Sequence, residues 1–226
     1  MTPNADYVGR YRDVQLSLIE GLERPVGPLP LSVMVGTNAE LIRAIAPLYL
    51  TGSVMDVTYG QGRWWDLYRP ENLVYHDLAR DGVDFRQLPH GDREFDSVTY
   101  DPPYVESGGV GHLDGFQDRY GLGRRRLPRG CDRLIVEGMS EVCRVARTFV
   151  LVKCMEYAQG GRIDFHDVPT LVTNAATDCG WIKHDQIVHH TGTGPGGHNI
   201  FRVKRARRAH SYLIVFTLPP IGRSEP

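Results

Sequence analysis

The tetrapeptide Asp101-Pro102-Pro103-Tyr104 combines residue types that can bind and activate a flat molecule carrying an amino group. It follows the apolar, β-prone run of residues 95–100, so an acid and an aromatic ring stand directly after a predicted buried strand. Two consecutive prolines cannot donate to a strand ladder and fix φ, which leaves a rigid backbone whose carbonyls can accept hydrogen bonds. Taken alone, the tetrapeptide fits a structural proline turn equally well.

A turn with two glycines follows an earlier predicted strand over residues 53–57. It reads Thr58-Tyr59-Gly60-Gln61-Gly62 and comes after the acid Asp56. Two glycines this close together indicate that another group approaches the backbone closely. A dinucleotide fingerprint would need a third glycine where Trp65 stands, which disfavours NAD as a ligand. Without further context, the pattern fits a structural turn about as well as a cofactor loop.

Acidic residues close several of the predicted strands. Asp56 ends the first, Asp77 follows a strand over residues 73–76, Asp84 comes shortly afterwards, and Asp101 follows residues 95–100. In an open sheet the carboxyl ends of parallel strands meet at one edge, where ligands bind. Each acid alone is more typical of a cap or a turn, but four in succession favour a ligand with hydroxyl and amino groups.

Further helices and strands must connect and support these strand ends. Thr37 and Asn38 occupy N-cap positions ahead of apolar residues at helical spacing, and Gly180 stops a later apolar pattern. Apolar spacing predicts helices over residues 39–48, 131–145 and 168–179. Alternating or continuous apolar runs predict strands over residues 148–152, 181–190 and 212–218. Lys153 ends the first of these strands at the predicted ligand edge.

Length and composition describe one α/β domain with a substantial core. The chain has 226 residues, of which 41% are hydrophobic and 23% are charged. Residues 1–30 are expected to form a peripheral extension with a helix over residues 6–22. No apolar run of membrane-spanning length and no secretory leader stand out, which predicts a cytoplasmic protein without a membrane partner. The four cysteines lack Cys-x-x-Cys spacing, so we expect reduced thiols and no metal site.

The acidic strand ends, the glycine turn and the Asp-Pro-Pro-Tyr segment together resemble S-adenosylmethionine-dependent amino-methyltransferases. The similarity is strongest to the DNA adenine and cytosine amino-methyltransferases and extends to residues 207–216, which are similar to the family's final strand. It covers residues 35–218 approximately. The resemblance implies a doubly wound, Rossmann-like α/β fold whose seven-stranded sheet is mostly parallel, with an antiparallel last strand.

The resemblance also implies roles for the site residues. An exocyclic base amine is a poor nucleophile because its lone pair is delocalised into the ring. Asp101 and the Pro102 carbonyl would each accept one of its N–H bonds, Pro103 would keep the backbone rigid, and Tyr104 would stack on the base. Asp77 would bind the ribose hydroxyls of S-adenosyl-L-methionine, Asp84 its adenine amine, and the glycine turn its methionine end. The expected cofactor site comprises Asp56, Thr58, Tyr59, Gly60, Gly62, Asp77, Asp84 and Asp101.

Two basic segments favour a nucleic-acid substrate although the formal net charge is only −1. Residues 105–130 leave directly from the tetrapeptide and are interpreted as a lid rather than an unstructured insertion. Residues 191–209 join the last two predicted strands, and an antiparallel last strand would bring this connection to the same edge. A solvated charge run is the usual explanation for each segment alone, but two at one edge favour phosphate contacts. The residues concerned are Arg124, Arg125, Arg126, Arg205, Arg207 and Arg208.

The function predicted from the sequence is methylation of the exocyclic amine of adenine at N6 in DNA, which is favoured over RNA. Cytosine N4 methylation in DNA and amino methylation of RNA remain alternatives within the same enzyme class. An alternative of another class is a catalytically silent nucleic-acid-binding module that retains the cofactor fold. The presence of both Asp101 and Tyr104 argues against that last alternative.

Overall fold

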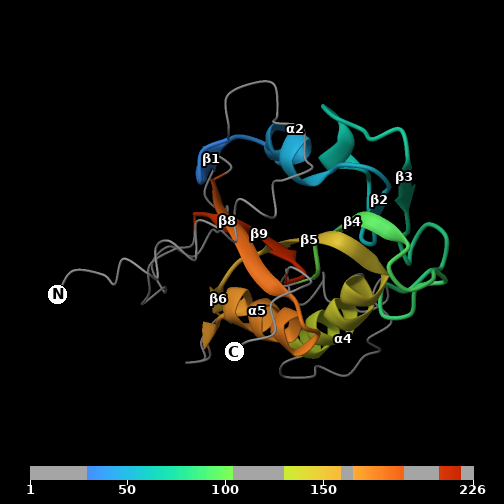
Figure 1. Cartoon of the computed structure of the whole chain (residues 1–226). Helices are drawn as coiled ribbons and strands as arrows, with labels where there is room; N and C mark the ends of the chain where they lie inside the picture. Colours follow the sequence, from blue (N-terminus) through green and yellow to red (C-terminus); the bar gives the residue numbers. More distant parts are fainter. Residues whose placement is uncertain (1–29, 104–129, 159–164, 191–208, 220–226) are drawn as a thin grey trace, which may run out of the picture.

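A seven-stranded sheet forms the centre of the computed structural model, which describes residues 30–103, 130–158, 165–190 and 209–219 (Figure 1). The strand order is β1-β8-β9-β5-β4-β2-β3. The strands are β1 (Val33–Val35), β2 (Val54–Asp56), β3 (Leu73–Tyr75), β4 (Phe95–Tyr100), β5 (Ala146–Cys154), β8 (Ile182–His190) and β9 (Ser211–Thr217). A separate two-stranded antiparallel ribbon is formed by β6 (Tyr157–Ala158) and β7 (Phe165–His166).

Six of the seven strands run in one direction. β2 pairs in parallel with β3 and β4, β4 with β5, and β1 with β8. β9 is antiparallel to both of its neighbours, β5 and β8. The expected doubly wound, Rossmann-like fold with a mostly parallel sheet and an antiparallel last strand is therefore confirmed. The direction of β9 also places the end of β8 and the start of β9 at the same edge, the carboxyl edge of the parallel strands.

Helices cover both faces of the sheet (Figure 1). One face carries α2 (Asn38–Tyr49) together with the short 3₁₀ helix η1 (Arg63–Trp65). The other face carries α4 (Gly130–Val145) and α5 (Val168–Asp178), which pack against each other. These three α-helices agree with the predicted ones to within one or two residues at each end, because their apolar residues follow the helical period closely.

The start of α2 is set by a capping box. The Thr37 hydroxyl accepts a hydrogen bond from the Glu40 amide at 3.2 Å, and the Glu40 carboxylate accepts one from the Thr37 amide at 2.7 Å. This reciprocal pair satisfies two amides that the first helical turn leaves without partners. The cap fixes Asn38 as the first helical residue, so its side chain is held at the carboxyl edge of the sheet.

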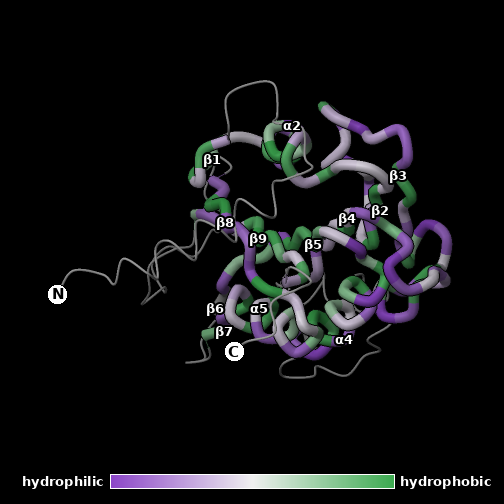
Figure 2. The backbone as a smooth tube through the Cα atoms, viewed as in Figure 1, coloured by the Kyte–Doolittle hydropathy of each residue, from purple (hydrophilic) through white to green (hydrophobic). Residues whose placement is uncertain are grey.

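Side chains of the central strands alternate between two hydrophobic cores. The hydropathy colouring of the backbone shows hydrophobic stretches along these central strands (Figure 2). From β5, Phe149 and Leu151 pack on the side of α2, whereas Val150 and Val152 pack on the side of α4 and α5. This period of two is the normal consequence of strand geometry. Continuing it by one residue places Lys153 on the α2 side.

A glycine allows α4 to approach β4 closely. A Cβ atom at Gly138 would overlap the hydroxyl group of Tyr100 and would lie 2.7 Å from a ring carbon of Phe85. Both rings belong to the core on the α4 side, where Tyr100 is fully buried and Phe85 is 5% exposed. Gly138 therefore fits the helix against the residue that immediately precedes Asp101.

Strand β1 and the β6–β7 ribbon were not predicted. β1 has three residues, and both of its valines are exposed, so the sequence contains neither a long apolar run nor a clear alternation there. Its pairing with β8 is long-range and leaves no local signal. The helix expected over residues 6–22, most of the lid segment and most of the 191–209 connection lie outside the described residues.

Candidate active site

The carboxyl edge of the sheet brings together Asp56, Asp101 and Lys153. Asp56 in β2 pairs with Thr99 of β4, and Tyr100 of β4 pairs with Val152 of β5. The residues that follow this last pair are Asp101, which comes directly after β4, and Lys153, which is still in β5, so they lie at the same level on adjacent segments. The predicted convergence of strand ends is present in the structure for these residues.

Asp101 has an available hydrogen-bond acceptor. Its backbone amide donates to the hydroxyl of Thr58 at 2.8 Å, which ties the Asp-Pro-Pro segment to the glycine turn. Its Oδ1 atom is buried and has no hydrogen-bond partner among the described residues. Burial raises the pKa of Asp101 to about 6, and the positive charge of Lys153 acts in the opposite direction. Pro102 and Pro103 are buried behind it, so the carboxylate is held on a rigid support.

Asp56 supports the glycine turn from the inside. Its Oδ1 atom accepts a hydrogen bond from the Thr58 amide at 3.0 Å, and Oδ2 accepts one from the Trp65 indole at 2.7 Å. Burial raises the pKa of this carboxyl to about 7, while the two donors oppose the rise. Both oxygens are thus already used within the protein. The predicted role of Asp56 at the cofactor site is, in this geometry, to shape the turn.

The two glycines of the turn have different surroundings. Both adopt positive φ, 54° at Gly60 and 74° at Gly62, a region that disfavours residues with a side chain. A Cβ atom at Gly62 would overlap the Tyr59 hydroxyl, whereas one at Gly60 would have the Thr58 carbonyl oxygen, 3.9 Å away, as its nearest neighbour. At position 62 any side chain would collide with the Tyr59 ring, so only glycine fits there. At Gly60 the space beside the backbone is open and could admit a ligand.

Asp77 and Asp84 occupy different environments after β3. Asp77 accepts hydrogen bonds from the amides of Gly60, at 2.9 Å, and Ala79, at 3.0 Å, so it anchors the glycine turn. Asp84 forms a bidentate ion pair with Arg86, whose hydrogen bonds lower the pKa of Asp84. Arg86 also lies 3.6 Å from Glu137 of α4. If Asp84 also bound an adenine amine, as the family resemblance implies, its carboxylate would have to accept hydrogen bonds from that amine and from Arg86 at the same time.

An aromatic stack beside the glycine turn was not anticipated from the sequence. The rings of Tyr59 and Tyr75 lie 4.0 Å apart at an angle of 23°. The guanidinium groups of Arg69 and Arg80 both lie within 6 Å of the two ring centres. Such cation–π contacts stabilise a ring arrangement at a partly exposed surface. Nothing in the local sequence marks the pair, because the two tyrosines lie on separate segments of the chain.

The lysine at the end of β5 is also more constrained than the sequence suggested. Lys153 is 3% exposed, and its Nζ atom donates to the Asn38 side-chain oxygen at 2.7 Å. Burial lowers the pKa of Lys153, and the charge of Asp101 opposes that effect. The sequence contained one signal of this burial. Lys153 directly follows the apolar run Phe149–Val152, and a solvated lysine is unusual in that position.

Several predicted site residues lie outside the described part of the chain. These are Tyr104 and the six arginines proposed to contact phosphate, at positions 124, 125, 126, 205, 207 and 208. Among residues 30–103, 130–158, 165–190 and 209–219, no group of three or more His, Cys, Asp or Glu side chains is placed to hold a metal ion. Within the same ranges, no helix combines the length and apolar character needed to cross a membrane.

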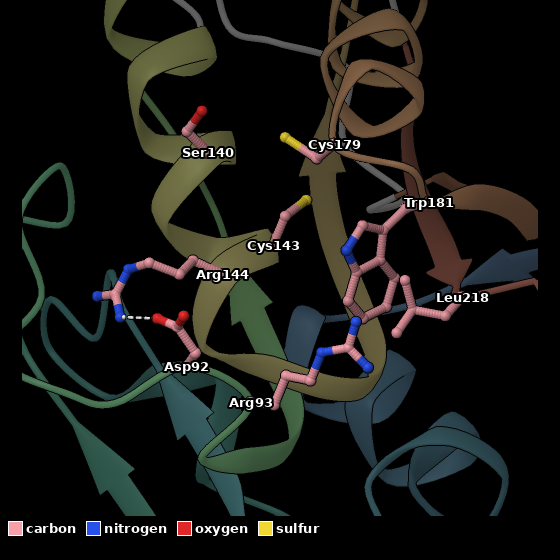
Figure 3. A pocket seen from close by; sticks show the side chains of 8 residues that line it. All are labelled: Asp92, Arg93, Ser140, Cys143, Arg144, Cys179, Trp181 and Leu218. Carbon is pink, nitrogen blue, oxygen red and sulfur yellow. Dashed lines mark hydrogen bonds and ion pairs between the residues drawn. The ribbon is translucent and has the colours of Figure 1, made fainter.

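A pocket of about 290 Å³ lies away from this site (Figure 3). Arg93 precedes β4, Trp181 precedes β8, and Leu218 follows the antiparallel β9, so all three mark the amino edge of the sheet. Cys143 and Arg144 of α4 complete much of the wall, where Arg144 forms an ion pair with Asp92 at 2.9 Å. The pocket is therefore separate from the carboxyl edge, where Asp101 and the glycine turn meet.

Comparisons with protein-family models and with curated protein sequences find no match to this chain. Among solved structures, a candidate DNA modification methylase from Thermus thermophilus, complexed with S-adenosyl-L-methionine, is 13% identical, with a TM-score of 0.41 over 77% of this chain and 56% of that one. The [4+2]-cyclase SpnF is 13% identical, with a TM-score of 0.45 over 98% of each chain. The 1,6-didemethyltoxoflavin-N1-methyltransferase of Burkholderia thailandensis, with bound S-adenosylhomocysteine, is 11% identical, with a TM-score of 0.41 over 96% and 87%.

The present chain spans a little over half the length of the Thermus thermophilus methylase. Strand order and strand direction, rather than these distant similarities, establish the fold described above. The site is likewise defined by its own residues: an open acceptor on Asp101, a rigid proline pair, and a glycine turn held by Asp56 and Asp77.

Proposed function

We propose that this protein is an S-adenosyl-L-methionine-dependent methyltransferase that modifies the exocyclic amino nitrogen of a nucleobase, specifically adenine N6 in DNA. The observation that carries this proposal is the Oδ1 atom of Asp101, which is buried and has no hydrogen-bond partner within the described part of the chain. The backbone amide of the same residue is tied to the glycine turn through Thr58. A buried acceptor without a partner is costly, so it is best explained by a donor on a ligand.

The residues at the carboxyl edge fit the needs of this reaction. Asp101 would accept one N–H bond of the base amine, and the Pro102 carbonyl would accept the other, which localises the nitrogen lone pair. Tyr104 would stack on the base and hold it in line for transfer. A base in a duplex would first have to leave the stack, at a cost of a few kcal/mol. No strong general base is needed, because the proton can leave the amine after methyl transfer.

The glycine turn fits the cofactor. When bound, S-adenosyl-L-methionine supplies an electrophilic methyl group on a sulfonium sulfur. The open space at Gly60 would admit the methionine end, and Asp77, which fixes the Gly60 amide, would also face the ribose. The Thr58–Asp101 hydrogen bond would keep cofactor and amine in a constant relation. Asp84 would contact the adenine amine while it retains its ion pair with Arg86.

The proposal is tested by incubating the protein with S-adenosylmethionine labelled on the methyl group, together with a mixture of DNA and RNA. Digestion to nucleosides should then show label in N6-methyladenine from DNA. Label in N4-methylcytosine, or in RNA nucleosides, would replace the adenine assignment with one of the alternatives. Binding of nucleic acid without any transfer of label would support a catalytically silent module and would contradict the proposal.

Replacing Gly60 by valine is expected to weaken binding of S-adenosylmethionine by at least about tenfold, or 1.4 kcal/mol. The branched side chain would project into the open space of the turn, at a positive φ of 54°. Gly180→Val is the matched control, because Gly180 also has a positive φ, of 82°, and a Cβ atom placed there would meet nothing within 4 Å. Calorimetry should show weaker binding in the first variant only, and equal affinities would remove the turn from the cofactor site.

Neutralising Arg205, Arg207 and Arg208 together is expected to weaken DNA binding for all sequences alike. Each lost phosphate contact should lower the slope of log affinity against log salt concentration by about 1. Affinity for S-adenosylmethionine should not change, since these residues are proposed to contact only the substrate. Affinities measured across a salt series test this expectation. An unaltered slope would leave Arg124, Arg125 and Arg126 as the candidate phosphate contacts.

A further inference from the structure

We propose that Lys153 is a positioning residue that keeps the Asp101 carboxylate ionised, so that it can accept a hydrogen bond from the substrate amine. This inference rests on the proposed methyl transfer and assigns a role to a residue outside the Asp-Pro-Pro-Tyr segment. Lys153 acts through Asp101 and need not touch the substrate.

The register of the sheet brings the two residues together. Tyr100 pairs with Val152, so Asp101 and Lys153 are the next residues on two adjacent parallel strands. The alternation along β5 directs Lys153 toward the α2 side, where its ammonium group reaches Asn38 at the first position of that helix. Because the capping box at Thr37 fixes the start of α2, the position of the ammonium group is fixed as well.

The burial of Lys153 requires an explanation that its single hydrogen bond does not give. An ammonium group has three donors, and among the described residues its hydrogen bond goes to Asn38 alone. A lysine that is 3% exposed loses most of its hydration, which is costly without a compensating negative charge. Asp101 provides that charge from the neighbouring strand, since it favours the charged form of Lys153.

The interaction leaves the Asp101 carboxylate open. The described residues contain no ion pair between Asp101 and Lys153 within 4 Å, and Asp101 Oδ1 has no hydrogen-bond partner there. The lysine therefore stabilises the negative charge through space without occupying the oxygen atom. That combination suits an acceptor that must remain ionised and must also receive an N–H bond from a ligand.

Other titratable groups around this pair do not replace Lys153. Asp56 on β2 is a buried acid, and the charge of Asp101 raises its pKa further. Cys154 on β5 has a pKa raised by burial, so it remains a neutral thiol. His189 on β8 has a pKa lowered by burial and by Lys153, and its Nε2–H donates to the Gly36 carbonyl at 2.9 Å. The lowered pKa favours the uncharged imidazole, and Lys153 is the group whose positive charge acts on Asp101.

The sign of the effect on activity follows directly. Burial raises the pKa of Asp101, and Lys153 lowers it. Without the lysine charge, the Asp101 carboxyl would hold its proton to higher pH and would donate a hydrogen bond instead of accepting one. In Lys153→Met, the acidic limb of the profile of log kcat against pH should shift toward higher pH by about one pH unit. Activity should fall by about tenfold on that limb and recover at higher pH.

Three variants separate charge from packing. Lys153→Met keeps the length of the side chain, Lys153→Arg keeps the charge, and Lys183→Met removes an exposed lysine near the start of β8 as a matched control. In Lys153→Arg, the acidic limb should lie closer to its wild-type pH than in Lys153→Met. In the control Lys183→Met, the limb should stay at the wild-type pH. A uniform loss of rate across the whole pH range in Lys153→Met, with an unmoved limb, would overturn the inference.

A titration of Asp101 tests the inference without requiring enzyme activity. Carbon-13 NMR of the aspartate carboxyl groups, with the signal assigned through Asp101→Asn, should show a higher pKa for Asp101 in Lys153→Met than in the wild type. An unchanged pKa would refute the role of Lys153 even if the protein transfers methyl groups. Conversely, a shifted pKa in a protein that methylates nothing would retain the electrostatic coupling and refute the proposed function.

A reciprocal measurement covers the case in which Lys153→Met does not fold. Coupling between two sites is the same seen from either one, so loss of the Asp101 charge must lower the pKa of Lys153. NMR of the lysine Cε–Nζ group should show this decrease in Asp101→Asn relative to the wild type. Equal lysine pKa values in the two proteins would show that the residues are not coupled.

Discussion

Replacing Asp101 with alanine is expected to lower kcat for methyl transfer by about 10³-fold, which corresponds to about 4 kcal/mol of lost transition-state stabilisation. The reason is that the variant has no acceptor to localise the lone pair of the amine. Binding of S-adenosylmethionine should persist in large part, because the glycine turn is held by Asp56 and Asp77. Single-turnover rates and calorimetric cofactor affinities measured on the same preparation check both statements.

The control for this experiment is Asp178→Ala, which removes an exposed acid at the end of α5 and should leave both quantities unchanged. Asp101→Asn is informative as well, because an amide oxygen can still accept one hydrogen bond but carries no charge. It should be more active than the alanine variant and less active than the wild type. If cofactor affinity falls as far as the rate in Asp101→Ala, Asp101 serves the cofactor rather than the amine.

The largest effect on stability is expected at Gly138, where valine should lower the free energy of unfolding by about 3 kcal/mol, the upper end for an overfilled core. The new side chain would overlap the Tyr100 hydroxyl and press on Phe85, so α4 would have to move away from β4. The gain from replacing a helical glycine, at most about 1 kcal/mol, is smaller than this loss. Urea denaturation gives the difference directly.

Gly91→Ala is the matched control for that substitution. A Cβ atom at Gly91 would lie 3.5 Å from a Glu94 carboxylate oxygen, which is an ordinary contact. Its stability should differ from that of the wild type by no more than about 0.5 kcal/mol, as is usual for surface positions. A similarly small change in Gly138→Val would mean that Tyr100 and Phe85 can move aside, and that the fit between α4 and β4 is loose.

The sequence was most informative where local patterns decide the structure. The three long helices were predicted from apolar spacing and from the caps at Thr37 and Gly180. The central strands were predicted from apolar runs, and those of β2 and β4 are followed or closed by an acid. The direction of the last strand came from the family resemblance rather than from any local pattern. Strand β1 escaped prediction because its stability comes from pairing with β8, more than 150 residues away, and three mostly exposed residues carry no signal of that.

At the site, the sequence identified which acids stand at strand ends but not what each one contacts. Asp56 and Asp77 hold the glycine turn, and Asp84 pairs with Arg86, whereas Oδ1 of Asp101 has no hydrogen-bond partner among the residues that the structure describes. These differences depend on which donors fold against each carboxylate, and the donors come from separate elements. The same reason hides the Lys153–Asn38 contact, which joins residues 115 positions apart.

The place of β9 in the sheet constrains the order in which the chain can fold. β9 is the last described strand in the sequence, yet it lies between β5 and β8 and is the only described strand to pair with both. Until it is present, the sheet itself consists of two parts that no strand pairing joins, β3-β2-β4-β5 and β8-β1. During synthesis on the ribosome, the edges of β5 and β8 that pair with β9 therefore lack their native partner until residues 211–217 emerge. A chaperone that shields open strand edges would be most useful to this protein in that interval.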